Sequence, residues 1–284
     1  MSFGTDFQVL DMPDFITITI VTIRPSKLAT YLVQRLIMSN LLHALVLLLR
    51  STKYNYDTFR IAPHNYWYKR FQSFLPLGSK APNFSCLDTD GKRVSLSEYH
   101  RKSFVVLEFG CMTCAPAVTQ AATYPNSLSK LAPKYQPQGV EFLMVYTRET
   151  HPGENVCRHN SFSEKMEHAK TFRKEDQVKL RLIVDSLDGK IHRKYGMLPN
   201  MVYIISKEGR IVYKASWTDS ADIAEALDNL ILWDREGFTP MDSVAVVQKY
   251  HFIYDRNLEE HKRIYERAGR KAVKDLRREI EYPI

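Results

Sequence analysis

The sequence predicts an α/β fold in which a mixed β-sheet carries helices on both faces. Three observations support this prediction. Between residues 78 and 233, short apolar runs typical of buried strands alternate with stretches of helical composition. The last two apolar runs are joined by a short turn, so that pair is antiparallel, whereas runs separated by a helix are parallel. Hydrophobic residues make up 44% of the chain and charged residues 25%, which excludes general disorder.

The predicted elements begin with an N-terminal hairpin. Asp90-Gly91 separates two short apolar runs within residues 82–96, a pattern typical of a hairpin turn. Residues 104–109 (FVVLEF) form a predicted buried strand, because the run is short and rich in β-branched and aromatic side chains. Pro116 then opens a helical stretch that we expect to reach Lys134, since proline is well tolerated in the first turn of a helix.

The second half of the domain repeats this alternation. The predicted elements are a strand at 140–147, a charged helix at 163–175, a strand at 181–185, a short helix ending at Tyr195, a hairpin of strands at 201–206 and 210–214, and a helix from Ala221 to about Trp233 capped by Ser220. The order is β-α-β-α-β-(short α)-β-β-α. This is the thioredoxin-like layout with a redoxin-type N-terminal hairpin.

Two extensions flank the predicted domain. Residues 1–77 include an apolar stretch at 28–49 that is long enough for a membrane span but is interrupted by Gln34 and Arg35. We leave two interpretations open: a membrane anchor, which positive-inside bias would orient with the large C-terminal part in the cytoplasm, or a helix packed on the domain. Residues 234–284 are highly charged, and we interpret them as a solvated helix packed along one edge of the domain, with a partner-binding helix as the alternative.

Net charge and cysteine content narrow the classes of function. The net charge is +8 and the pI is near 9.2, which permits attraction to anionic lipid. We find no nucleic-acid motif and expect no nucleic-acid partner, so we take the charge as a hint of a membrane surface. Four cysteines in 284 residues are too few for a disulfide scaffold. Two of them stand three residues apart, a spacing that indicates redox chemistry or metal binding.

The most informative segment is residues 109–116 (FGCMTCAP), between a predicted buried strand and a predicted helix. The unpaired N–H groups and the dipole of a helix N-terminus favour a negative charge, and the thiolate is the nucleophilic form of cysteine. Cys114, directly before the first helical turn, is therefore the predicted nucleophile. Its neighbour Thr113 is predicted to contact the substrate.

Cys111 has two interpretations. As a resolving thiol it would attack a sulfenic acid or mixed intermediate on Cys114 and close a disulfide, which requires Cα atoms within about 7 Å. The alternative is a packed, inert residue at a strand end. Zinc is disfavoured, because a structural site needs four ligands, usually in paired clusters, and no second Cys or His pair stands at suitable spacing. We therefore predict no bound metal.

His151 follows the second buried strand, just as Cys114 follows the first. Ligands gather beyond the carboxyl ends of strands in an α/β sheet, so we expect the two residues to share one site. There His151 would stabilise a thiolate or donate a proton to a leaving group; the alternative is a surface-loop histidine. Glu149 is predicted either to orient His151 or to be solvated.

Pro199 precedes a predicted strand, at a place where the thioredoxin layout puts a cis-proline against the nucleophile. A proline there would shape the substrate groove. An X-Pro bond is usually trans, so this prediction depends on the fold.

Several motifs occur in one order along residues 78–232, a little over half of the chain. They are the segment at 109–116, Val145-Tyr146 with Glu149-Thr150-His151-Pro152, Val184-Asp185-Ser186-Leu187-Asp188, Tyr195-Gly196 and MVYIISKEGRIVYK at 201–214. Together they resemble the iodothyronine deiodinase family, within the wider thioredoxin and peroxiredoxin-like superfamily.

The resemblance implies roles for individual residues. Cys114 stands where that family typically carries selenocysteine, which takes iodine from an aryl iodide. It also implies a catalytic role for His151, places Glu149 in the same acidic loop, and favours an N-terminal membrane anchor. Two departures matter: cysteine is a less acidic nucleophile than selenocysteine, and Cys111 with Met112 replaces the serine and cysteine common in that family. The departures fit a general thiol reductase or a peroxide-reducing role at least as well as they fit thyroid-hormone turnover.

We therefore expect a cysteine-dependent oxidoreductase that acts on an aryl iodide, a peroxide or a disulfide. We predict no bound cofactor and an external thiol such as thioredoxin or glutathione as reductant. The peroxidase interpretation is weakened because Thr113 directly precedes Cys114, so the usual proline, threonine and arginine set is missing. Two further interpretations are a non-enzymatic membrane-associated interaction protein and a metal-binding module. A homodimer and a cytoplasmic catalytic domain are left open.

Overall fold

The computed structural model describes residues 7–9, 19–21, 54, 71–122, 127–237, 247–249 and 258–274. The apolar stretch at 28–49 lies outside them. Two compact units are present, Met1–Leu49 and Arg50–Ile284. In the first, β1 (Phe7–Val9) and β2 (Thr19–Val21) pair antiparallel. None of the helices in these ranges has the length and apolar character needed to cross a bilayer.

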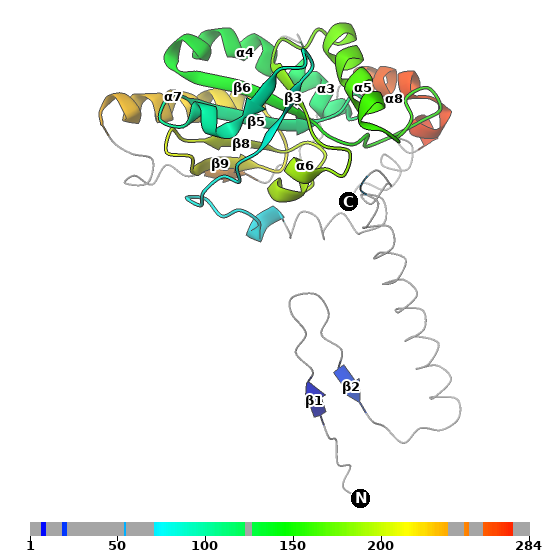
Figure 1. Cartoon of the computed structure of the whole chain (residues 1–284), viewed down its shortest axis with the longest axis horizontal. Helices are drawn as coiled ribbons and strands as arrows, with labels where there is room; N and C mark the ends of the chain where they lie inside the picture. The colour runs from blue at the N-terminus through cyan, green and yellow to red at the C-terminus, as the bar shows by residue number, and fades with distance from the viewer. Residues whose placement is uncertain are drawn as a thin grey trace, which may run out of the picture. The chain divides into compact units, whose positions relative to one another are not determined.

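The second unit is built on one mixed sheet, seen edge-on in Figure 1. Among the described residues eight strands join it, in the order β10-β9-β8-β5-β6-β7-β3-β4. The strands are β3 (Ser85–Asp88), β4 (Arg93–Ser95), β5 (Phe104–Gly110), β6 (Val140–Tyr146), β7 (Arg181–Val184), β8 (Val202–Ile205), β9 (Ile211–Ala215) and β10 (Val247–Lys249). β5, β6 and β7 are parallel, whereas β8 is antiparallel to β5 and to β9. The predicted thioredoxin-like α/β fold is confirmed.

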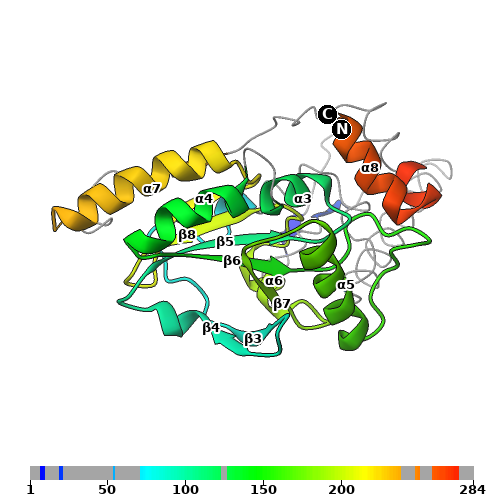
Figure 2. The ribbon, with the colours of Figure 1, turned by 90° about the horizontal axis from the view of Figure 1, so that it is seen from above.

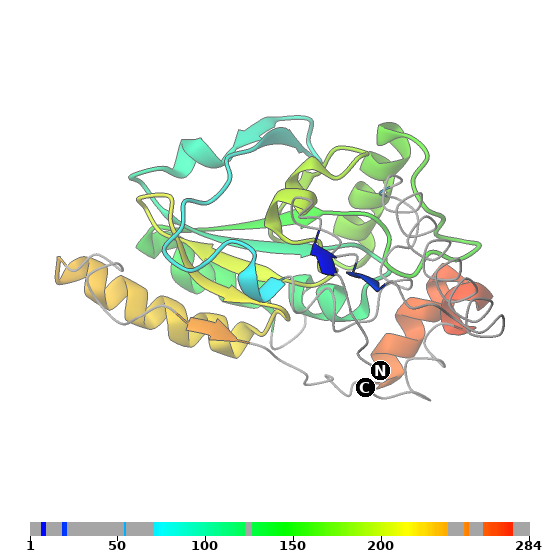
Figure 3. The same cartoon turned by 90° about the horizontal axis from the view of Figure 1, so that it is seen from below.

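Helices cover both faces of this sheet, as Figure 2 shows from above. They are η1 (Leu96–Tyr99), α3 (Ala115–Ala121), α4 (Leu128–Tyr135), η2 (Gln136–Gln138), α5 (Phe162–Glu175), α6 (Lys190–Tyr195), α7 (Ser220–Arg235) and α8 (Leu258–Ala268). Side chains alternate between two apolar cores along the central strands: Val106 and Phe142 belong to the core with α3, α4 and α7, and Leu107 and Leu143 to the core with α6. Figure 3 shows the α6 face from below.

The helix predicted from Pro116 to Lys134 is two helices. α3 ends at Ala121, and α4 begins at Leu128 with the hydroxyl of Ser127 accepting the N–H of Lys130. Pro125 stands in the sequence between them, and the residue before a proline disfavours helical dihedrals. The predicted cap of α7 was also wrong by one residue, because Asp219 accepts the N–H groups of the first turn.

The charged C-terminal segment forms the predicted helix, α8, which packs against the domain and buries one side. Ile264, Tyr265, Ala268 and Ala272 are buried, at spacings that put them on one side of the segment. This apolar side packs on the core beside α3, and Figures 1 and 2 both place α8 near the α3 end of the sheet. α8 is therefore part of the domain structure around the β5–α3 junction.

Gly110, the last residue of β5, lets α3 approach the sheet closely. A Cβ at this position would lie 2.4 Å from the Cβ of Ala117 and 2.7 Å from the Cε of Met144. We predict that Gly110→Ala lowers the free energy of unfolding by about 1–3 kcal/mol, because overpacking must displace α3. Denaturant unfolding measures the change. The double variant with Ala117→Gly removes the opposing Cβ, so its cost should be smaller than the sum of the two single costs; simple additivity would contradict this account.

Candidate active site

The CxxC segment links the end of β5 to the start of α3. Cys114 is the N-cap residue of α3: its backbone is extended, and its carbonyl accepts the N–H of Val118 at 2.9 Å. Its own N–H donates to the carbonyl of Cys111 at 3.1 Å, which closes the loop into a tight turn. Both cysteines are thiols. The turn therefore holds Cys114 at the helix N-terminus, the position predicted for the nucleophile.

Cys111 is fully buried and surrounded by hydroxyl and amide groups. Its Sγ accepts the N–H of Thr150 at 3.2 Å and lies 3.3 Å from the Thr150 hydroxyl and 3.5 Å from the Thr113 hydroxyl. Burial, with a smaller effect of the Glu149 charge, raises the pKa of Cys111 to about 12. Cys111 is thus protonated at neutral pH, which leaves Cys114 as the cysteine of this pair suited to attack first.

Glu149 lies in the loop after β6 and is buried among hydrogen-bond donors. One carboxylate oxygen, Oε2, accepts the hydroxyl of Thr113 at 2.7 Å. The other, Oε1, accepts the hydroxyl of Tyr146 and lies 3.1 Å from Nε2 of His159 and 3.4 Å from Nδ1 of His168. Burial by itself would raise the pKa of Glu149, but the hydrogen bonds to His159 and His168 outweigh it and hold the pKa well below its usual range.

The hydroxyl of Thr113 joins the loop after β5 to the loop after β6. It donates to Glu149 and accepts the backbone N–H groups of Thr150 at 3.1 Å and His151 at 3.2 Å. Because β5 and β6 are parallel neighbours in register from Phe104 to Gly110, both loops leave the same edge of the sheet. The structure thus brings the predicted residues of the two loops together, and it buries Thr113 in a bridging position rather than presenting it to substrate.

We predicted that Glu149 either orients the His151 ring or is solvated, and the structure instead connects the two residues through Thr113. Glu149 is neither solvated nor hydrogen-bonded to the His151 ring; in the described structure its carboxylate contacts Thr113, Tyr146, His159 and His168. It reaches His151 only through the Thr113 hydroxyl, which accepts the His151 N–H. Glu149 therefore positions the loop rather than the imidazole.

α8 covers this site. The ring of Tyr265 packs on the ring of His151 with centroids 4.8 Å apart. Nη2 of Arg267 donates to the carbonyl oxygen of Met112 at 2.7 Å, and its Nη1 donates to buried Asp176 at 2.7 Å. Cys114 is 3% exposed and His151 is 6% exposed. Substrate access to the thiol therefore requires movement at this surface.

Sequence reasoning missed five residues of the site. Tyr146, His159 and His168 surround Glu149, and Tyr265 and Arg267 come from α8. The apolar spacing in α8 was a usable signal, whereas the two histidines lie on a loop and a helix at separations that fit no common motif.

Pro199 lies between α6 and β8, as predicted. The described part of the chain contains no cis peptide bond, so the bond before Pro199 is trans. The neighbouring Asn200 is buried, and its side-chain oxygen accepts the N–H of Thr218 at 2.7 Å. A groove-shaping role for Pro199 stays a prediction.

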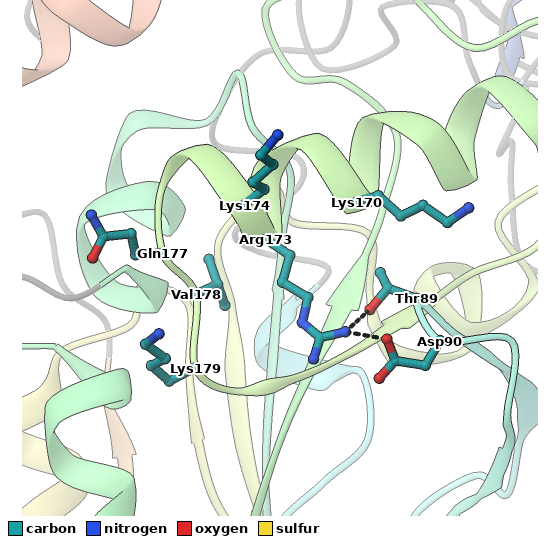
Figure 4. Close-up of a pocket in the computed structure, with 8 residues that line it drawn as sticks. All are labelled: Thr89, Asp90, Lys170, Arg173, Lys174, Gln177, Val178 and Lys179. Atoms are coloured by element: carbon teal, nitrogen blue, oxygen red, sulfur yellow. Dashed lines mark hydrogen bonds and ion pairs between the residues drawn. The ribbon is translucent and has the colours of Figure 1, made fainter.

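A surface hollow elsewhere on the domain carries positive charge. It lies between the end of α5 and the β3–β4 turn, and Lys170, Arg173, Lys174 and Lys179 line it with Thr89 and Asp90 (Figure 4). Arg173 donates to Thr89 at 2.9 Å and to Asp90 at 2.6 Å. No cysteine or histidine is among the residues that line this hollow, so it offers no thiol for redox chemistry.

The contact of Arg267 with Met112 gives a test of the α8 cover. A hydrogen bond from a charged group contributes about 1.5–3 kcal/mol, so we predict that Arg267→Ala raises the rate of Cys114 alkylation by iodoacetamide by about tenfold. Peptide mass mapping separates Cys114 from the exposed Cys157. Arg263→Ala is the matched control, because Arg263 also pairs with Asp176, at 3.4 Å, from the same helix. Equal rates in the two variants would refute the prediction.

Comparison with known proteins finds a match to one family, and it finds relatives among thiol-disulfide oxidoreductases and iodothyronine deiodinases. Residues 77–214 match the AhpC/TSA family. Thiol-disulfide oxidoreductase ResA of Bacillus cereus is 30% identical over 142 residues, 49% of this chain and 69% of ResA. Type I iodothyronine deiodinase of Xenopus laevis is 25% identical over 147 residues, 49% of this chain and 56% of the deiodinase. The chain thus spans about half of that deiodinase.

Solved structures each match somewhat more than half of the chain. The thioredoxin domain of a thiol-disulfide oxidoreductase from Bacteroides vulgatus is 19% identical with a TM-score of 0.44, and the match covers 55% of this chain and 99% of that one. The mitochondrial 2-Cys peroxiredoxin of Plasmodium falciparum is 17% identical with a TM-score of 0.40, and covers 58% and 99%.

Proposed function

The chain belongs to the AhpC/TSA family of thioredoxin-like redox proteins, and on that premise we propose that it is a thiol–disulfide oxidoreductase with Cys114 as nucleophile. The observation that carries the proposal is the CxxC turn, which sets Cys114 at the start of α3 and keeps its partner Cys111 as a protonated, buried thiol. A thiol at the start of a helix and a second thiol three residues before it suit sequential attack and resolution.

The proposed reaction begins when the Cys114 thiolate attacks one sulfur of a disulfide. A bond forms between Cys114 and that sulfur, and the other sulfur leaves as a thiolate that takes a proton from His151. A second thiol then attacks the Cys114 sulfur, releases the bound thiol and leaves a disulfide. That second thiol is Cys111, once its proton is removed, or an external reductant such as glutathione or thioredoxin. In either case two electrons pass from thiols to the substrate.

Reductive deiodination is the second candidate. It is favoured by the Glu149-Thr150-His151 loop beside Cys114 and by the match to deiodinases. In that reaction the Cys114 thiolate takes iodine from an aryl iodide, and the aryl carbon takes a proton. An external thiol then displaces iodide from the sulfur and leaves a mixed disulfide. Peroxide reduction, with Cys114 oxidised to a sulfenic acid, is the third candidate.

A substrate panel distinguishes the three reactions. The full chain is assayed with excess dithiol against a protein disulfide, hydrogen peroxide and an iodothyronine, and Cys114→Ser is measured beside it. We expect disulfide reduction to be the fastest reaction and to require Cys114. Iodide release that requires Cys114 and exceeds disulfide reduction would make deiodination the function. No Cys114-dependent turnover of any of the three would refute an oxidoreductase role.

A further inference from the structure

Three metal-binding atoms converge beside the active-site loop. They are Oε1 of Glu149 and Nε2 of His159, both in the loop between β6 and α5, and Nδ1 of His168 on α5. Glu149 and His159 have fully buried side chains, and the His168 side chain is one quarter exposed. The three atoms form a triangle with edges of 3.1, 3.1 and 3.4 Å.

No placement of the histidine ring protons gives all three atoms of this triangle a suitable hydrogen-bond partner. If both histidines carry a proton on the atoms that face each other, two donors are opposed at 3.1 Å. Both would then also compete for Oε1, which already accepts the Tyr146 hydroxyl and offers only two lone pairs. If one histidine carries the proton, a single N–H is left to serve two acceptors. A shared cation is a simpler partner, because each of the three atoms gives it one lone pair and Oε1 keeps its second for Tyr146.

The dimensions of the triangle fit a small transition-metal ion. Zn²⁺ binds histidine nitrogen and carboxylate oxygen at about 2.0–2.2 Å, so two ligands of a tetrahedral site lie about 3.3–3.5 Å apart. The observed edges are at or slightly below this range. We propose that Glu149, His159 and His168 bind one divalent transition-metal cation, of which Zn²⁺ is the best match, with a fourth position open to water on the exposed side of His168. This departs from the sequence prediction of no bound metal, which rested on the lack of paired Cys or His clusters.

A cation here would tie α5 to the active-site loop. Oε1 of Glu149 would bind the ion while Oε2 accepts the hydroxyl of Thr113, which in turn holds the N–H groups of Thr150 and His151. The ion would position the loop and would not contact the reacting sulfur. This inference is independent of the proposed redox function.

Metal binding is measured in a Cys111→Ser/Cys114→Ser/Cys157→Ser background, so that thiolates do not compete for the ion. Zn²⁺ stoichiometry and affinity come from titration against a chromophoric chelator, and Co²⁺ gives a visible spectrum that reports coordination number and ligand type. His168→Ala and His159→Gln each remove one ligand, and His100→Ala, on an exposed histidine of the same domain, is the matched control.

We expect one Zn²⁺ per chain, a four-coordinate nitrogen/oxygen Co²⁺ spectrum, and an affinity loss of about 100-fold or more in each ligand variant but not in His100→Ala. Circular dichroism of each variant confirms that the loss is not unfolding. Absence of binding by the triple-serine background, or unchanged affinity in His168→Ala, a partly exposed position that tolerates alanine, would overturn the proposal.

Discussion

Replacement of Cys114 by serine is expected to lower the rate of thiol–disulfide exchange by at least about 1,000-fold, because a serine hydroxyl does not ionise at neutral pH and forms no stable bond to sulfur. The variant should fold normally, since cysteine and serine are close in size. Initial rates of disulfide reduction with excess dithiol measure the effect, and circular dichroism checks the fold.

Cys111→Ser is the matched control for this prediction. Burial raises the pKa of Cys111 to about 12, so its loss should leave the first attack by Cys114 intact and block only internal resolution. Incubation with a disulfide should then trap a mixed disulfide on Cys114, visible by intact-mass spectrometry. Equal loss of the first half-reaction in Cys111→Ser and Cys114→Ser would contradict the assignment of the nucleophile.

Glu149→Gln is expected to lower the free energy of unfolding by about 3 kcal/mol, because it removes a buried charge from a set of donors arranged around it. The amide NH2 group would face the hydroxyl of Thr113 or of Tyr146 with a donor, where each of these hydroxyls now donates to a carboxylate oxygen. Activity should fall as well, since the substitution weakens the hydrogen bond from the Thr113 hydroxyl to residue 149, and Thr113 helps to position the active-site loop. Denaturant unfolding and initial rates measure both effects.

Glu141→Gln, on the same strand as Tyr146, is the control for Glu149→Gln, because Glu141 is only half-buried. Its stability should stay within about 0.5 kcal/mol of the parent. Thr113→Val separates two roles of Glu149, which are to position the active-site loop and to stabilise the fold. The substitution removes the hydroxyl that links Glu149 to the loop, but it leaves the contacts of the carboxylate with Tyr146, His159 and His168 in place. Activity unchanged in Thr113→Val would show that the bridge does not position the site.

Much of the fold followed from local pattern. Strands such as β5 and β6 were predicted to within one residue because a buried strand reads as a short, continuous apolar run. The break between α3 and α4 was missed, since helical composition continues on both sides of Pro125 and the prediction gave that proline too little weight. The buried side of α8 was missed because the sequence reasoning gave more weight to the many charged residues of this segment than to the spacing of its few apolar residues.

The sequence by itself determined the α/β order, the CxxC segment at a strand–helix junction and the placement of Cys114 and His151 after neighbouring strands. These depend on periodicity and chain order, which are local properties. Only the tertiary structure decided that Glu149 faces Thr113 and His159, and that Arg267 from α8 reaches the carbonyl of Met112. These three contacts join residues that are 10 to 155 positions apart, and their geometry depends on how whole elements pack, which no local pattern encodes.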